Sequence, residues 1–194
     1  QSGDLKQSAD LNRKLAVVDR RGRTEYLEHV ARLETQLGRI DEALAAGREL
    51  IAAAPGNVET YQFFADMCFR LGRSADGFTA LRRASRVNPN EPALLLSLAA
   101  ALTGQFRTDE AIELYWQALE KQRQIDDKLN VINKLAELYL QTNHLDQLLE
   151  RLQRGQREAD QRREMTICLA QAYQSAGDYG MARQELERLL SENT

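Results

Sequence analysis

The chain repeats itself every 34 residues. Gly38 and Gly72 lie 34 positions apart, and so do Pro55 and Pro89. The same offset relates a series of small and apolar residues: Ala31, Ala65 and Ala99, then Leu81 and Tyr115, then Ala84 and Ala118. A unit of this length is one supersecondary element that buries its apolar face against its neighbours. We therefore expect a stack of similar units with mostly local contacts.

The repeat continues in the C-terminal part of the chain after a shift of three residues. Matching pairs there are Ala136 and Ala170, and Tyr139 and Tyr173. Asn143 and Gly177 are also 34 apart, and both tolerate the left-handed backbone conformation with which helices commonly end. Asn143 follows Gly72 by 71 positions, which is two repeats plus three. We therefore expect an insertion at 126–128.

Each unit has the pattern of two amphipathic helices. In the first unit Leu27, Val30 and Ala31 lie on one stripe of a 3.6-residue helix, which Gly38 is expected to end. Small residues recur at one place in each helix: Ala31, Ala65, Ala99, Ala136 and Ala170 in the first, and Ala43, Gly77, Ala111 and Ala182 in the second. Helices packed in a tight hairpin need small side chains where their axes approach.

Two helices per 34 residues, with a glycine at the hairpin and a proline after the second helix, resemble the tetratricopeptide repeat (TPR) family. The resemblance implies an all-α fold, a right-handed superhelical solenoid of helix-turn-helix repeats. The repeats are assigned to residues 24–57, 58–91, 92–125, 129–162 and 163–194, and residues 1–23 to the second helix of a truncated upstream repeat. Because the chain begins with Gln1, it is expected to be a piece of a longer protein.

Three glycine positions depart from the family pattern. Gly77 replaces alanine in the second repeat, and Gly155 falls within the second helix of the fourth repeat. Phe106 stands where the hairpin glycine of the third repeat should be, so Gly104 is expected to take that role. The later repeats are therefore expected to stack less regularly.

In the family, the first helices line a concave groove in which a peptide or helix of a partner docks. The groove positions correspond here to Glu28, Arg32, Gln62, Phe63, Asp66, Phe69, Arg70, Leu96, Asn133, Glu137 and Gln171. One branch of the family clamps the C-terminal carboxylate of heat-shock chaperones with lysines, asparagines and an arginine. Those positions hold Glu28, Arg32, Phe63, Ala93 and Ser97, so the clamp function is rejected. The mixture better suits an amphipathic or extended segment.

Aromatic residues offer the sharpest candidates for a binding contact. Phe63 and Phe69, beside Arg70, have the composition of a binding hot spot, although both could instead pack against neighbouring repeats. Trp116 follows a core tyrosine on a second helix and is expected to be partly exposed on the outer face.

Neither catalysis nor a metal, cofactor, nucleic-acid or membrane-spanning role is expected. His29 and His144 form no metal-ligand pair, and Cys68 and Cys168 are 100 positions apart. Cys68 is expected in the core, whereas Cys168 could face the groove. The net charge of −3 argues against a bulk electrostatic grip on nucleic acid, and clustered arginines such as 82, 83 and 86 are expected on solvated faces. The nearly apolar run 93–102 is half a membrane span.

The sequence therefore predicts a protein–protein interaction scaffold, whose groove binds a peptide or helix of an unidentified protein partner. A spacer or oligomerisation array, and a regulatory module of a larger enzyme or secretion assembly, stay open as alternatives. Self-association is expected through an apolar stripe on the last helix, formed by Leu186, Leu189 and Leu190. The cytoplasm is favoured for this segment, while the location of the parent protein stays open.

Overall fold

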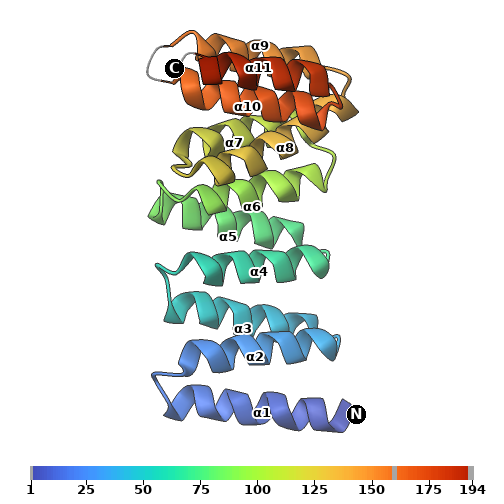
Figure 1. The fold of residues 1–194 in the computed structure, drawn as a ribbon. Coiled ribbons are helices and arrows are strands. Elements are labelled where there is room, and N and C mark those ends of the chain that lie inside the picture. The colour runs from blue at the N-terminus through green and yellow to red at the C-terminus, as the bar shows by residue number, and fades with distance from the viewer. Residues whose placement is uncertain (1, 159–160, 192–194) are drawn as a thin grey trace. The chain divides into compact units, whose positions relative to one another are not determined.

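The computed structural model describes residues 2–158 and 161–191, and these residues form eleven α-helices and no strand (Figure 1). The predicted all-α fold class is confirmed. In these residues no helix is both long enough and apolar enough to cross a membrane. The helices are α1 (Ser2–Val18), α2 (Arg23–Gln36), α3 (Ile40–Ala53), α4 (Val58–Arg70), α5 (Ser74–Val87), α6 (Pro92–Thr103), α7 (Thr108–Lys121), α8 (Ile125–Gln141), α9 (Leu145–Gln156), α10 (Arg162–Ser175) and α11 (Tyr179–Ser191).

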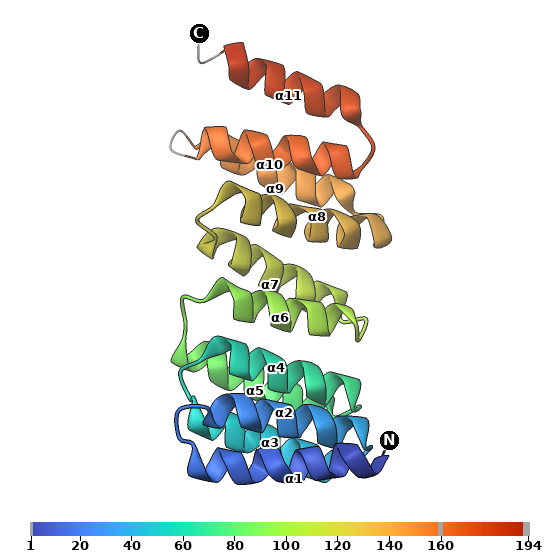
Figure 2. The ribbon, with the colours of Figure 1, turned by 60° about the horizontal axis from the view of Figure 1, so that its bottom comes forward.

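The chain divides into two units, residues 1–98 and residues 99–194, with the boundary inside α6. In the first unit α1 packs against α2, α2 against α3, α3 against α4 and α4 against α5. In the second unit α8 packs against α7, α9 and α10, and α10 packs against α9 and α11. Helices that are close in sequence are therefore close in space, as Figures 1 and 2 show within each unit.

The recurring small residues lie at the helix contacts, as predicted. Their exposed fraction is at most 2% at Ala31, Ala65, Ala99, Ala136 and Ala170 on the first helices, and at Ala43, Ala111 and Ala182 on the second. Gly77 on α5 has a specific reason to lack a side chain, because a Cβ there would lie 3.0 Å from the ring of Phe69. Gly47 on α3 is tighter still, since its Cβ would lie 2.3 Å from Cδ2 of Phe64.

A residue in the left-handed conformation closes the first helices of the hairpins, as predicted. The φ angle is 72° at Gly38, 72° at Gly72, 58° at Asn143 and 81° at Gly177. Each of these turns is completed by the next residue, whose backbone N–H donates to a carbonyl five positions earlier. In the Gly72 turn, for example, Arg73 donates to Cys68 at 2.8 Å.

The turn between α6 and α7 uses Phe106 itself at the left-handed position. Its φ angle is 60°, and Arg107 N–H donates to the carbonyl of Leu102 at 3.0 Å, which is the same closure as in the other turns. The prediction that Gly104 replaces the hairpin glycine is therefore wrong. The hydrogen-bond pattern at the end of α6 decides which position turns left-handed, and the glycine two residues earlier lies at the wrong place in that pattern.

The proposed insertion at 126–128 falls in the first turn of α8. This helix has 17 residues, compared with 14 in α2 and α10, a difference of almost one turn. Its first turn also carries Lys128, whose ammonium group contacts the carboxylate of Glu164 on α10. The position of the predicted insertion therefore includes an ion pair between two first helices.

The turn between α1 and α2 is held by the carboxylate of Asp19. It accepts hydrogen bonds from the backbone N–H groups of Arg21 (3.0 Å) and Gly22 (3.3 Å) and from the hydroxyl group of Tyr26 (3.2 Å). These donors stabilise the ionised form, Gly22 most strongly, and lower the pKa of Asp19.

Trp116 is buried, so the prediction of partial exposure is wrong. Its exposed fraction is 4%, and its indole N–H donates to the hydroxyl oxygen of Tyr139 at 3.3 Å. The guanidinium carbon of Arg151 lies 4.1 Å from the centre of the indole ring. The ring therefore packs against α8 and under a side chain of α9, rather than facing solvent.

The last helix, α11, keeps part of its apolar stripe at the surface. Leu190 is 70% exposed, whereas Leu186 and Leu189 are half-buried. Self-association through this helix stays a prediction.

Candidate peptide-binding face of the first helices

The residues predicted for a groove all lie on even-numbered helices, which are the first helices of the hairpins. Every one of them is exposed or half-buried. They are Glu28 and Arg32 on α2, Gln62, Phe63, Asp66, Phe69 and Arg70 on α4, Leu96 on α6, Asn133 and Glu137 on α8, and Gln171 on α10. Their surroundings differ, and only some of them line a hollow.

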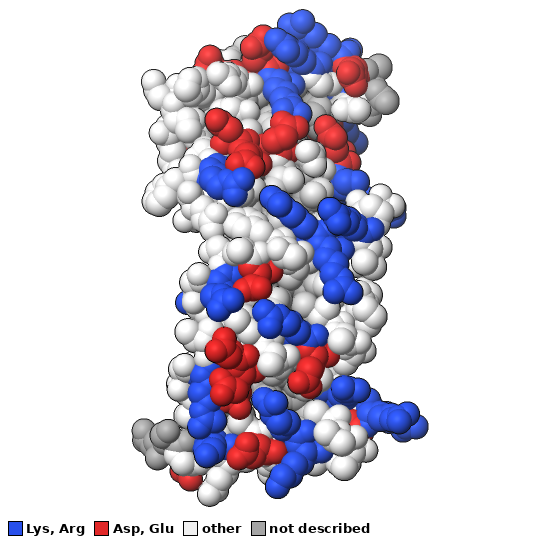
Figure 3. Space-filling view, turned by 180° about the vertical axis from the view of Figure 1, so that it is seen from behind, with Lys and Arg blue, Asp and Glu red and all other residues white. Residues whose placement is uncertain are grey.

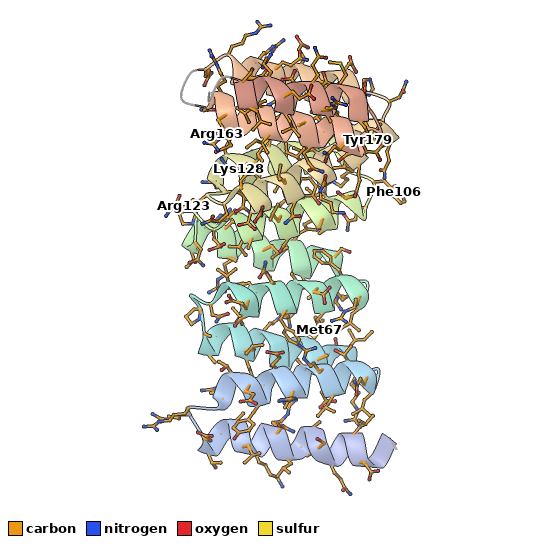
Figure 4. The ribbon with its side chains drawn as sticks, viewed as in Figure 1. Met67, Phe106, Arg123, Lys128, Arg163 and Tyr179 are labelled. Atoms are coloured by element: carbon orange, nitrogen blue, oxygen red, sulfur yellow. The ribbon has the colours of Figure 1, made fainter. Side chains whose placement is uncertain are left out.

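In the first unit a hollow of about 170 Å³ opens between α2 and α4. It is lined by Arg32, Thr35, Gln36, Phe63, Met67 and Arg70. Phe63 is half-buried: it packs against the core cluster that contains Leu27, while the guanidinium carbon of Arg32 lies 4.7 Å from its ring centre. Met67, labelled on α4 in Figure 4, is 2% exposed, so it lies at the bottom of the hollow.

The two arginines of this hollow are both paired with a carboxylate one turn earlier. The distance from Arg32 Nη2 to Glu28 Oε1 is 2.6 Å, and that from Arg70 Nη2 to Asp66 Oδ2 is 2.7 Å. All four side chains are more than 40% exposed. Exposed pairs of this kind typically contribute about 0–1 kcal/mol to stability. A carboxylate of a ligand can therefore replace Glu28 or Asp66 beside its arginine at little cost.

Phe69 does not line this hollow. Its ring packs edge to face against Phe78 of α5, with the ring centres 5.2 Å apart and the planes at 70°. It also lies against Gly77. Phe69 therefore contributes to packing within the α4–α5 hairpin.

The predicted amide residues bind polar side chains of neighbouring first helices. In the first unit the side-chain amide of Gln62 donates to the hydroxyl oxygen of Ser97 at 2.8 Å, which joins α4 to α6. In the second unit Gln171 and Ser175 of α10 each donate to Oδ1 of Asn133 on α8, both at 2.8 Å. These amides already have partners, so they hold the first helices together and are poorer candidates for ligand contacts.

The remaining predicted residues do not line the hollow. Glu137 is exposed and pairs with Lys134 on the same helix, with 3.0 Å between Oε2 and Nζ. Leu96 is half-buried on α6. The predicted first-helix residues of the second unit are thus polar, with partners of their own.

The hollow also contains Gln36, which is a groove position by the family register, and two residues that were missed from the sequence, Thr35 and Met67. Thr35 follows Arg32 by three positions, and Met67 follows Phe63 by four. Residues three or four apart share one face of a helix, so the helical period applied from Arg32 and Phe63 would have found them.

The two cysteines lack the exposure and the lowered pKa of catalytic thiols. Cys68 and Cys168 have an exposed fraction of 0%. Burial raises the pKa of Cys68 to about 12 and that of Cys168 to about 11, whereas a reactive thiolate needs a lowered pKa. The core position of Cys68 is confirmed, and the prediction that Cys168 could face the groove is wrong. Within residues 2–158 and 161–191 no group of three or more His, Cys, Asp or Glu side chains is placed to hold a metal ion.

The chain is similar in structure to several solved proteins. BtubC (BKLC) from P. vanneervenii has 20% identity, with 98% of this chain and 89% of that chain covered, and a TM-score of 0.59. YrrB, a TPR protein with an unusual peptide-binding site, has 14% identity, with 95% and 84% covered, and a TM-score of 0.52. The chain has a tetratricopeptide-repeat fold.

A further TPR neighbour is pilF from Pseudomonas aeruginosa, with 16% identity, 90% of this chain and 78% of that chain covered, and a TM-score of 0.53. No family model matches the chain, and no curated protein matches its sequence. At such identities the likeness concerns the TPR fold, while the function depends on the residues of the site.

Proposed function

We propose that this TPR array is a non-enzymatic scaffold for protein–protein interaction, and that it binds a peptide or helical segment of a partner on α2 and α4. The observation that carries the proposal is the hollow in which Phe63 lies under Arg32 and beside Arg70. YrrB, which shares the fold, is a TPR protein with a peptide-binding site, and this supports a peptide as the ligand.

The chemistry of the hollow suits an apolar side chain with an acidic neighbour. Aromatic and arginine side chains supply most of the large contributions at protein interfaces, and the ring of Phe63 is already held in place by the core behind it. An apolar side chain of the ligand would cover the open part of this ring. A nearby carboxylate would compete with Asp66 for Arg70, whose pair is exposed to water.

The test is affinity capture from a lysate of the source organism, with the native chain compared with a Phe63→Ala/Arg70→Ala variant. A Phe106→Ala/Arg107→Ala variant is the matched control, because it also removes one phenylalanine and one arginine but lies in the α6–α7 turn. Circular dichroism would first establish equal helicity of all three proteins.

We expect a partner that the native chain and the control retain and the Phe63/Arg70 variant loses. Loss of a hot-spot residue costs at least about 2 kcal/mol of binding free energy. This raises the dissociation constant roughly thirtyfold, which calorimetry can measure once the partner is known. Equal retention by all three proteins would place the binding surface elsewhere. Capture of no partner would favour the spacer alternative.

A further inference from the structure

A second hollow, of about 280 Å³, lies in the first unit between α3, α4 and α5. Its floor is apolar and consists of Ile51, Tyr61, Phe64 and Ala80, each at most 7% exposed. Cavities of about 150 Å³ already hold a benzene molecule. The hollow therefore has room for one large apolar side chain.

The rim of this hollow is cationic. Its one carboxylate, Asp76, is paired with two guanidinium groups, at 3.3 Å from Arg48 Nη2 and at 3.2 Å from Arg73 Nη2. Arg83 also lines the hollow and is exposed. The charge of Asp76 is thus already compensated, whereas that of Arg83 is not.

Arg83 belongs to a set of three exposed arginines on α5, with Arg82 and Arg86, which we name the α5 basic face. None of the three pairs with a carboxylate anywhere in the described part of the chain. The sequence explains this, because α5 contains no acidic residue after Asp76. Figure 3 shows that Lys and Arg side chains gather in places on the rear face.

The α5 basic face differs from three other exposed helix surfaces that carry an arginine. On each of these the arginine has a carboxylate one turn away: Arg32 pairs with Glu28, Arg154 with Glu150, and Arg183 with Glu187. Such pairs neutralise the surface locally. On α5 three positive charges stay available next to an apolar hollow.

We propose that the 280 Å³ hollow and the α5 basic face together form a second docking surface, for a protein segment in which a large apolar side chain stands beside acidic residues. The apolar side chain would enter the hollow and contact Tyr61 and Phe64. The acidic residues would pair with the arginines of α5. This surface lies on α3, α4 and α5 and shares no lining residue with the Phe63 hollow between α2 and α4, so the inference does not depend on the proposed function.

Acidic residues on α3 and on the rim of the hollow favour a short acidic protein segment over a nucleic acid. Asp41, Glu42 and Glu49 are exposed on α3, and Asp76 lies on the rim. A nucleic-acid strand carries a phosphate at every nucleotide, so it would be repelled by these carboxylates. It also needs a continuous cationic surface. A peptide can place its few carboxylates on α5 alone.

The test is a selection of random dodecapeptides, displayed on phage, against the full 194-residue chain. Enriched peptides are then measured by fluorescence anisotropy against two variants of the surface. The triple variant Arg82→Glu/Arg83→Glu/Arg86→Glu inverts the α5 basic face, and Thr79→Trp fills the hollow, which Thr79 lines. Should the triple variant not fold by circular dichroism, the corresponding triple alanine variant replaces it.

Two further variants serve as controls. Arg154→Glu makes the same substitution at one exposed arginine of α9. Phe63→Ala removes the aromatic residue of the first hollow, so peptides that bind there are recognised and set aside. A failure of the proposed function and a failure of this inference are thereby distinguished.

We expect enriched peptides that combine a large apolar residue with adjacent aspartate or glutamate. Their dissociation constants should rise at least about tenfold in the triple variant and in Thr79→Trp, and less than about twofold in Arg154→Glu and Phe63→Ala. Peptides without acidic enrichment, or binding that both surface variants leave unchanged, would overturn the inference. So would a single-stranded oligothymidine that binds more tightly than the peptides and is lost in the triple variant, because it would indicate a nucleic-acid surface.

Discussion

Replacement of Phe106 by glycine is expected to stabilise the second unit. The φ angle of 60° places Phe106 in the left-handed region, which costs a residue with a Cβ roughly 1–2 kcal/mol. Glycine removes this cost, but it gives the unfolded chain additional freedom that offsets about 0.4–1 kcal/mol. The Phe106 side chain is 92% exposed, so its loss uncovers almost no apolar surface. The balance is a gain of about 0.5–1 kcal/mol in the free energy of unfolding.

Thermal unfolding followed by circular dichroism measures this gain directly. For a chain of this length, 1 kcal/mol corresponds to about 2–4 °C in melting temperature, so Phe106→Gly should melt about 1–4 °C above the native chain. Urea denaturation should show a higher midpoint with an unchanged slope.

The matched control is Asn143→Gly, in the equivalent turn between α8 and α9. Asn143 has a φ angle of 58°, and asparagine adopts the left-handed conformation more easily than phenylalanine. Its replacement should therefore change the melting temperature less. The reasoning is refuted by a Phe106→Gly variant that melts at or below the native temperature, or by equal gains at the two positions.

Three further predictions follow from packing and from ionisation. Gly47→Ala should lower the free energy of unfolding by about 1–3 kcal/mol in urea denaturation, because the new Cβ would lie 2.3 Å from Cδ2 of Phe64; Gly104→Ala, whose nearest neighbour is 3.6 Å away, should not. Ala65→Leu should overpack the α4–α5 hairpin at a cost of about 1–3 kcal/mol, and an unchanged melting temperature would contradict this. Asp19→Asn should reduce the sensitivity to acid: the lowered pKa of Asp19 stabilises the fold above its ordinary value of 3.8, and this contribution is lost as the pH falls through the lowered pKa. Acid titrations with the same midpoint in both proteins would speak against that role.

The repeat spacing was sufficient to predict the hairpins and their contacts. Geometry requires the residue types at positions such as Ala65 and Gly72. Ala65 lies where two helices touch, and Gly72 takes a positive φ angle. The prediction failed at Phe106, because a side chain that rarely adopts this conformation occupies the turn. The turn at Phe106 is closed by the same backbone hydrogen bond as the other hairpins, and it forms without a glycine.

Individual exposures were harder to predict than the helices. Trp116 and Cys168 were assigned to faces by repeat register, but both are buried, and Trp116 contacts Tyr139 of α8 and Arg151 of α9. Glu34 is a charged residue that is 3% exposed on α2, paired with Arg39 at 3.5 Å and with Arg13 of α1 at 3.7 Å. No periodic pattern reveals such a partner, because α1 precedes the first assigned repeat.

The candidate sites show the same limit. Helical spacing placed Arg32, Phe63 and Arg70 on first helices, and the structure adds that they line one hollow. The hollow between α3, α4 and α5 was not predicted, because its depth depends on three helices at once. Only the arginines of α5 were visible in the sequence, and the absence of paired carboxylates became clear once their neighbours were known.

The two native thiols provide a separate sensor for each unit. Cys68 lies in the first unit and Cys168 in the second, and neither is accessible in the folded chain. A thiol reagent can modify each of them only when the surrounding helices open, so the two modification rates in native buffer report two local opening free energies. A ligand that binds α2 and α4 should slow the modification of Cys68 and leave that of Cys168 unchanged. The unmodified natural sequence can thus show, by mass spectrometry, which half of the array a partner holds.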